Sequence, residues 1–338
     1  MSARDPPSAN PPTDFPSPPA HRGTGAAPPS RGPWVVAGIV ATVVLVAGVL
    51  VGLHYLVPST TPHATSNLIP VVAAENFWGS LVAQLGGTHV SVLSIVSDPN
   101  ADPHDYESNT TDAIALSTAK LVIQNGDGYD DWCTQLLSSS PNPGRVVVVA
   151  QAVVGAPLGV NPHFWYEQRY VIQMAGAMYS ALVSIDRADQ AYYQQQYAAL
   201  NTSLEVVWAR EAEIQTQFGG TNVSSTESIF QYMANSTGLN LVSPYEFMKA
   251  VAEGSDPPAW SVTVFENQLT SGTVSVLVYN LQTVTPLTQQ MKAIAASHNV
   301  STVGVTETIQ PPDLTFQVWI EGELLALENV LDQKALGV

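Results

Sequence analysis

The sequence is poor in cysteine and in cationic side chains. Cys133 is the only cysteine in 338 residues, so no disulfide can form within the chain and packing alone must hold the fold. Eleven Lys and Arg stand against 28 Asp and Glu, a net charge of -17, which disfavours nucleic acid as a partner because polyphosphates are bound by clustered cations. The hydrophobic fraction of 45% excludes a wholly disordered chain, and the length suits about two domains.

The common catalytic motifs are also missing. The chain has no HExxH, no GxSxG and no Walker A loop. The NGDGYD segment, residues 125–130, lacks the glycine spacing of a dinucleotide-binding turn. No motif therefore predicts metalloprotease, α/β-hydrolase or nucleotide chemistry.

The N-terminal region combines a polar tail with a long apolar run. Residues 1–33 are rich in Pro, Ser, Ala and Gly and predict a disordered tail. Residues 34–57, WVVAGIVATVVLVAGVLVGLHYLV, carry no formal charge and would form a helix of about 36 Å, long enough to span a bilayer. The long leader and the length of this run favour an uncleaved anchor over a signal peptide, whose apolar region is shorter.

Charge predicts the orientation of this anchor. The tail has three Arg and two Asp, so by the positive-inside rule it stays cytoplasmic and the remainder is exported. The acidic excess then falls entirely on the exported part. Such a field would concentrate cations, although an acidic surface can also serve solubility alone.

Beyond a short polar linker, apolar strand-like runs alternate with helical segments. Alternation of this kind predicts parallel sheets covered by helices on both faces. The predicted strands are residues 68–75, 90–96, 120–125, 145–150, 274–280 and 301–307, with residues 239–247 extended as well.

A stretch free of Gly and Pro divides these runs into two groups. Residues 186–218 predict a helix on the order of 45 Å long. The sequence thus predicts an α/β fold of two lobes, each with a central parallel sheet flanked by helices, joined by one long rigid helix and preceded by a single transmembrane helix.

Two histidines lie in similar settings. His104 in NADPHDYE and His163 in VNPHFWYE each follow a proline, which biases the preceding backbone toward an extended conformation. Each imidazole would be presented from a loop on the carboxyl side of a strand, where open α/β sheets bind ligands. Either histidine could instead be an ordinary surface or core residue.

At these motifs the sequence resembles the zinc and manganese solute-binding proteins of ABC transporters, a family that includes metal-binding lipoprotein adhesins. The resemblance extends from about Leu68 to Leu331. Its most specific part is GTHVSVLSIVSDPNADPHDYESNTTDAIALSTAKLVIQNGDGYDDW, which is similar to the first lobe of the family. NPHFWYE, ESIFQYMANSTGLNLV and VGVTETIQPPDLTFQVWIEGELLALENVL are similar to the segments that supply the other ligands.

The resemblance implies four metal ligands and a binding role. His104 and His163 match the two histidines, Glu227 falls where zinc-selective relatives often have His and manganese-type relatives have Glu, and Glu307 matches the last, acidic position. It further implies a non-enzymatic, monomeric carrier that captures a divalent metal between its lobes and delivers it to an ABC permease in the membrane.

Two imidazoles and two carboxylates suit a divalent transition metal. Their net charge of about -2 would neutralise the ion, and calcium or magnesium would prefer all-oxygen ligands. We expect Zn²⁺ or Mn²⁺ as cargo. The Irving–Williams order favours zinc over manganese at almost any such site, so the types of ligand alone do not rank the two ions as the physiological cargo.

The sequence departs from the family in two respects. No Cys follows the apolar run to carry a lipid anchor, and the His-rich loop of many zinc members is missing. Cys133 lies on an apolar helical face and is expected to be buried.

Two alternatives to the carrier remain open at this point. One is a membrane-tethered, metal-dependent hydrolase with an open coordination position, and the other is a metal-stabilised surface adhesion protein. The predicted organisation is as follows: tail 1–33, transmembrane anchor 34–57, linker 58–66, N-terminal metal-binding lobe 67–185, connecting helix 186–218 and C-terminal metal-binding lobe 219–338.

Overall fold

The computed structural model describes residues 68–100 and 102–336, which lie in a compact unit that begins at Thr65. The predicted tail, transmembrane anchor and linker lie outside these residues. Among the residues that the structure describes, no helix is long and apolar enough to cross a membrane.

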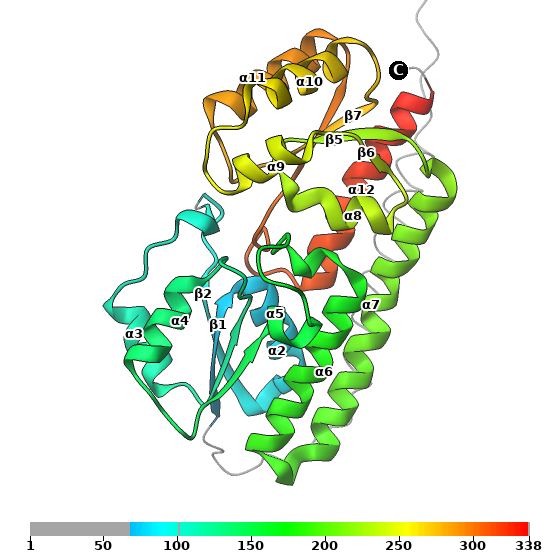
Figure 1. Ribbon diagram of the computed structural model, residues 1–338. Helices are drawn as coiled ribbons and strands as arrows, with labels where there is room; N and C mark the ends of the chain where they lie inside the picture. Colours follow the sequence, from blue (N-terminus) through cyan, green and yellow to red (C-terminus); the bar gives the residue numbers. More distant parts are fainter. Residues whose placement is uncertain (1–67, 101, 337–338) are drawn as a thin grey trace, which may run out of the picture. The chain divides into compact units, whose positions relative to one another are not determined.

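The first lobe is a four-stranded parallel sheet with the order β2-β1-β3-β4 (Figure 1). Its central strands are short, continuous apolar runs that are buried on both faces, as parallel sheets require. The strands are β1 (Ile69–Glu75), β2 (Val90–Val96), β3 (Leu121–Gln124) and β4 (Val146–Val149), with the helices α2 (Asn76–Gly86), α3 (Thr110–Thr118), α4 (Asp131–Ser139) and α5 (Ala150–Val154).

Two features of this lobe follow directly from the sequence. Asn109 caps α3: its Oδ1 accepts from the backbone N–H of Thr111 at 2.7 Å, and its own backbone N–H donates to Asp112 Oδ2 at 2.8 Å. The helix therefore starts after the loop that carries His104. Cys133 in α4 is fully buried, as predicted.

The second lobe repeats the arrangement with a parallel sheet of order β6-β5-β7-β8. Its strands are β5 (Asn222–Ser225), β6 (Asn240–Leu241), β7 (Val276–Asn280) and β8 (Ser301–Val305), and its helices are α8 (Gln231–Ser236), α9 (Tyr245–Ala252), α10 (Ala259–Thr270) and α11 (Pro286–Ser297). The extended segment predicted over residues 239–247 is only partly correct. It pairs for two residues and then enters α9 at Tyr245, directly after Pro244, whose fixed φ suits a helix start.

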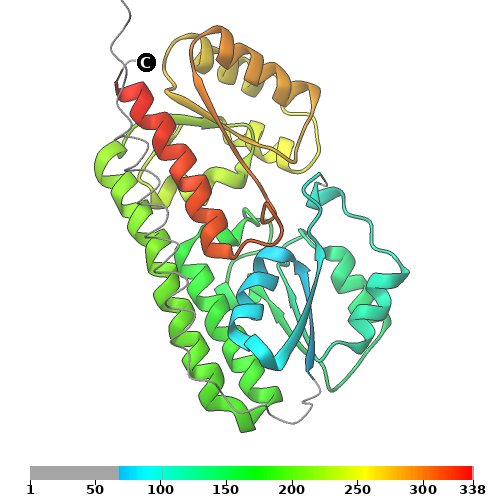
Figure 2. The ribbon, with the colours of Figure 1, turned by 180° about the vertical axis from the view of Figure 1, so that it is seen from behind.

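The lobes share a layer of three long helices, α6 (Gln168–Ile185), α7 (Gln190–Phe218) and α12 (Phe316–Ala335). Helix α7 contacts α2 and α6 in the first lobe and α8 and α12 in the second (Figures 1 and 2). The long helix predicted over 186–218 is therefore confirmed, although it begins at Gln190. Asp186 precedes it, followed by a 3₁₀ turn, η4 (Arg187–Asp189). The two-lobe α/β fold with parallel sheets is confirmed as well.

One hydrophobic core runs through both lobes. It includes Trp78 and Trp165 on the first-lobe side and Phe230 and Phe316 on the second, all at most 1% exposed. Because these side chains belong to one cluster, wide separation of the lobes would expose a large apolar surface. The architecture favours small movements at the cleft.

Candidate metal centre

The two predicted histidines come from loops of the first lobe. His104 lies in the short 3₁₀ turn η2 (Pro103–Asp105), where its backbone N–H donates to Asp102 Oδ1 at 3.0 Å. His163 immediately precedes a second such turn, η3 (Phe164–Tyr166), and is fully buried. The imidazole centroids are 5.8 Å apart, so the fold brings together two residues that are 59 positions apart in the chain.

Asn161 fixes the tautomer of His163. The Asn161 Nδ2 group donates to the carbonyl of Ser228 at 2.7 Å, so its Oδ1 is left as the acceptor that faces His163 Nδ1 at 2.5 Å. Nδ1 therefore carries the proton, and Nε2 presents a bare lone pair. A hydrogen bond of this kind on the far nitrogen is typical of metal-binding histidines.

Glu307 brings a carboxylate from the second lobe to these imidazoles. It follows β8, and its Oε2 lies 3.4 Å from His104 Nε2 and 3.9 Å from His163 Nε2. The donor atoms of these three residues all lie within 4.8 Å of one another. Both Nε2 atoms are buried without a hydrogen-bond partner, which is costly unless a cation is present.

Glu227 lies beside this group but outside it. It follows β5, is fully buried, and accepts a hydrogen bond on Oε1 from Asn280 Nδ2 at 2.6 Å. Its other oxygen, Oε2, has no hydrogen-bond partner. The same Asn280 Nδ2 donates to Glu307 Oε1 at 2.6 Å, so one amide group joins the two carboxylates.

Burial sets the protonation of the site. It raises the pKa of Glu227 well above its usual range, and the nearby charge of Glu307 raises it further. Burial also raises the pKa of Glu307, while His104 opposes that shift, and burial lowers the pKa of His163. Burial thus favours the neutral form of each of these three side chains.

The backbone beside Glu307 is held from both lobes. Gln282 Oε1 accepts from the N–H groups of Glu307 and Thr308 at 2.8 and 3.0 Å. Glu323 in α12 accepts from the N–H of Thr306 at 2.8 Å and from the hydroxyl of Tyr166, in the His163 loop, at 2.6 Å. These contacts hold the backbone from which the Glu307 side chain projects.

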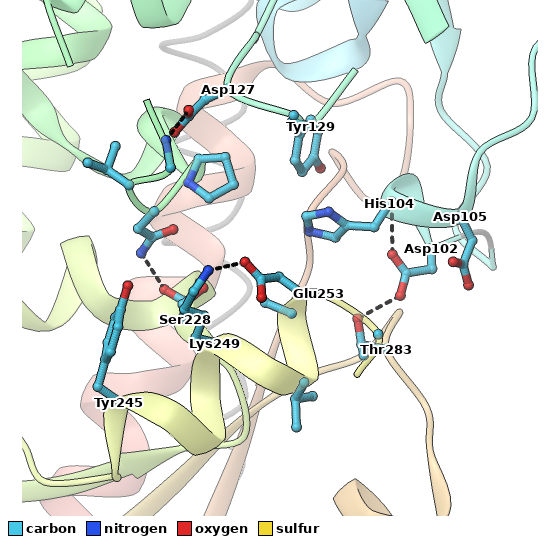
Figure 3. Close-up of a pocket in the computed structure, with 18 of the residues that line it drawn as sticks. Asp102, His104, Asp105, Asp127, Tyr129, Ser228, Tyr245, Lys249, Glu253 and Thr283 are labelled. Carbon is cyan, nitrogen blue, oxygen red and sulfur yellow. Dashed lines mark hydrogen bonds and ion pairs between the residues drawn. The ribbon is translucent and has the colours of Figure 1, made fainter. Parts of the chain in front are cut away.

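A cavity of about 440 Å³ leads to His104 from between the lobes. Asp102, Asp105 and Tyr129 line it from the first lobe, and Lys249 and Thr283 from the second (Figure 3). Thr283 Oγ1 donates to Asp102 Oδ2 at 2.9 Å and closes the lobes over the inner part of the site.

Residues 71–330, most of the chain, match the protein family described as "Zinc-uptake complex component A periplasmic". The chain belongs to this family. Its members are substrate-binding components and not enzymes, which agrees with the expectation from the sequence.

Similarity to individual proteins is more distant. The chain is 33% identical over 98 residues to a putative metal-binding protein of Treponema pallidum, covering 29% of this chain and 30% of that protein. It is 23% identical over 184 residues to the manganese-binding lipoprotein MntA of Halalkalibacterium halodurans, covering 53% and 61%. It is also 23% identical over 190 residues to the iron-binding protein YfeA of Yersinia pestis, covering 54% and 60%. The chain thus spans less than two thirds of the length of these curated relatives.

Solved structures match over a longer part of the chain. A crystal structure of ZnuA superposes with a TM-score of 0.65 at 19% identity, covering 78% of this chain and 99% of that one. The manganese-bound periplasmic metal-binding protein of Candidatus Liberibacter asiaticus gives 0.64 at 17% identity, covering 77% and 98%. At these identities the likeness concerns the fold.

Sequence reasoning placed two histidines and two glutamates at one site. The structure brings the donor atoms of three of them, His104, His163 and Glu307, close enough to bind one ion. Sequence reasoning missed Asn280 and Tyr129, which donate hydrogen bonds to the carboxylates, and Gln282, which holds the backbone at Glu307. All three are ordinary polar residues in sequence. Asn280 had one available signal, because it ends a predicted parallel strand and the carboxyl edge of such sheets is where ligands bind.

Proposed function

We propose that the chain is an extracytoplasmic protein that captures a divalent transition metal, Zn²⁺ or Mn²⁺, between its lobes and delivers it to an ABC permease for import. The observation that carries the proposal is the trio of His104, His163 and Glu307. Their donor atoms lie within 4.8 Å of one another, and two of these atoms are buried nitrogens without a partner. Membership of the zinc-uptake family supports the same role.

In this proposal His104, His163 and Glu307 ligate the ion and Glu227 completes the set. Glu227 Oε2 is buried and has no partner, and its neighbour Asn280 already contacts Glu307. This oxygen is the donor atom that Glu227 would offer to the ion. Two neutral imidazoles and two carboxylates then balance the charge of a divalent cation.

Release requires only local opening. Helix α7 and the common core resist a wide swing of the lobes, whereas the Asp102–Thr283 hydrogen bond over the site can break at little cost. Docking on the permease would use surface from both lobes. We further propose that the protein acts as a monomer and that residues 34–57 tether it to the membrane with residues 1–33 in the cytoplasm.

The test is metal content of the purified full chain after dialysis against mixed Mn, Fe, Zn and Ca. We expect one equivalent of a transition metal, lost in both His104→Ala and His163→Ala. His298→Ala is the matched control, because His298 is exposed and lies outside the site. A chain without bound metal, or binding that survives both substitutions, would contradict the proposal. Metal-dependent turnover of an ester or phosphoester would favour the hydrolase instead.

A further inference from the structure

Two acidic side chains outside the set of metal ligands are buried together in the first lobe. Glu75 is the last residue of β1 and is 1% exposed, and Asp130 immediately precedes α4 and is fully buried. Their carboxyl groups are hydrogen-bonded to each other. Two ionised carboxylates are acceptors only and repel each other, so this hydrogen bond requires that one of the two groups keeps its proton.

The contacts of Asp130 assign the proton to Glu75. Asp130 Oδ2 accepts the backbone N–H of Asn125 at 2.6 Å, and Oδ1 accepts that of Gly126 at 2.7 Å. Both oxygens therefore act as acceptors, as in an ionised carboxylate, whereas Glu75 Oε2 is buried and receives no hydrogen bond. The pKa values agree: burial and the charge of Asp130 raise the pKa of Glu75 well above its usual range, while burial, opposed by the backbone hydrogen bonds, raises that of Asp130 to about 6.

No cation replaces this proton. Neither carboxyl group forms an ion pair in the part of the chain that the structure describes. The other titratable groups that face the pair are Glu307, Tyr129 and Cys133, and Arg145 acts on the Cys133 thiol. Burial raises the pKa of Tyr129 and of Cys133, so both stay neutral at pH 7.

The loop that Asp130 holds, residues 125–130, contacts both the histidine side and the carboxylate side of the metal site. The Tyr129 hydroxyl donates to Glu307 Oε2 at 2.7 Å. Asn125 Nδ2 donates to the carbonyl of Pro162, directly before His163, at 2.8 Å. A change in the position of this loop would therefore displace groups that contact two of the ligand-bearing segments.

We propose that Glu75 is a positioning residue of the metal site: its carboxylic acid donates to Asp130, and Asp130 holds the loop that places Tyr129 against Glu307. The inference rests on the proposed function and adds a residue to the same site. The feature that matters is a hydrogen-bond donor at position 75. Neither a negative charge nor side-chain volume alone can replace it.

Two substitutions of similar volume separate the donor from the bulk of the side chain. Glu75→Gln keeps a donor for Asp130, and we expect it to bind zinc as the unmodified protein does. Glu75→Met has no donor, and we expect its zinc affinity to fall by about 10-fold, the lower end of the effect of groups that orient metal ligands through hydrogen bonds. Asp130→Asn should also weaken binding, because its amide nitrogen would face a backbone N–H.

The experiment measures zinc affinity at pH 7 by competition with a chelator, on the full chain and on each variant. Infrared spectroscopy of the metal-free proteins provides a second, independent measurement. We expect the carbonyl stretch of a protonated carboxyl group in the unmodified protein and its loss in Glu75→Gln. Glu205→Gln and Glu205→Met, at an exposed position in α7, are the matched controls and should change neither the affinity nor this band.

The outcomes separate this inference from the function on which it rests. Unchanged zinc affinity in Glu75→Met, or equal losses in Glu75→Gln and Glu75→Met, would overturn the role of Glu75 and leave the carrier intact. An unmodified protein that binds no metal would overturn the carrier itself. If Glu75→Met fails to fold, Glu75→Gln decides: loss of the infrared band with retained affinity supports the proposal, and an unchanged band contradicts it.

Discussion

The side chain of Asn76 exchanges two hydrogen bonds with the backbone of Ile309. Asn76 Nδ2 donates to the Ile309 carbonyl at 3.2 Å, and the Ile309 N–H donates to Asn76 Oδ1 at 2.9 Å. Asn76 begins α2 in the first lobe, and Ile309 lies two residues beyond Glu307 in the second. The lobe that supplies the histidines therefore also holds the loop that supplies the carboxylate.

We predict that Asn76→Ala destabilises the protein and weakens metal binding together. The substitution leaves a buried N–H and a buried carbonyl of Ile309 without partners, which costs about 1–3 kcal/mol of unfolding free energy. Urea unfolding of the metal-free protein and zinc titration are the two measurements. Asn267→Ala, at an exposed position in α10, is the control. Loss of stability with unaltered zinc affinity would show that the hydrogen bonds between Asn76 and Ile309 do not position Glu307.

A second prediction concerns protons released by the metal. The pKa values of Glu227 and Glu307 are raised and that of His163 is lowered, so protons that compete with the metal reside on the carboxyl groups and not on His163. Metal binding must expel them, and affinity should fall as the pH falls. Calorimetric titration at pH 7 in buffers of different ionisation enthalpy should detect net proton release. Binding enthalpies that are the same in all buffers would refute the prediction.

The buried Glu211 in α7 predicts a pH-dependent stability. Burial raises its pKa from 4.5 to about 7, so the folded state holds this proton more tightly than the unfolded chain. The resulting stabilisation is complete below pH 4.5 and is lost as the pH rises through 7. At pH 8 the ionised, buried carboxylate destabilises the native state by on the order of 3 kcal/mol.

Glu211→Gln should therefore stabilise the metal-free protein at pH 8 and have little effect at pH 5. Asp130 and Glu323 have raised pKa values, about 6 and about 7, and act in the same direction, so the comparison is between variant and parent at each pH. Thermal unfolding across this range provides the measurement. Glu205→Gln, exposed on the same helix, should have no such effect. An equal effect of Glu211→Gln at both pH values would exclude ionisation as the cause.

The fold was predictable where burial imposed a strong pattern. The apolar runs that became β1 and β3 are largely or fully buried parallel strands, and their β-branched residues identified them. Strand β5, with the sequence NVSS, was missed because it has only one apolar residue and is placed by its pairing with β6 and β7, which come later in the chain. Local pattern does not encode such pairings across the chain.

The residues of the site were likewise predictable only in part. His104 and His163 could be found from sequence because each has a distinctive Pro-His context. Asn280 was missed because an asparagine at a strand end is a common turn residue and its partners, Glu227 and Glu307, lie 53 and 27 positions away. Only the three-dimensional structure shows that one amide joins both carboxylates.

The last prediction concerns Arg210, which ties α7 to α12. Its guanidinium donates to Glu321 at 3.1 Å and to Glu328 at 2.9 Å, and it also contacts Glu213 in its own helix. Arg210→Ala leaves these carboxylates near one another without a cation. We expect a loss of about 1 kcal/mol in unfolding free energy, more than an isolated exposed pair gives, because several charges share one partner.

Salt distinguishes this charge network from simple packing of the arginine stem. At 1 M salt the Debye length falls to about 3 Å, so the cost of Arg210→Ala should shrink if charge is the cause. Arg210→Lys should not restore the loss, because an ammonium cannot present the guanidinium's several N–H groups to Glu321 and Glu328 at once. Arg187→Ala, exposed just before α7, is the control. A cost that is the same in low and high salt would assign the effect to lost packing of the side-chain stem against α12.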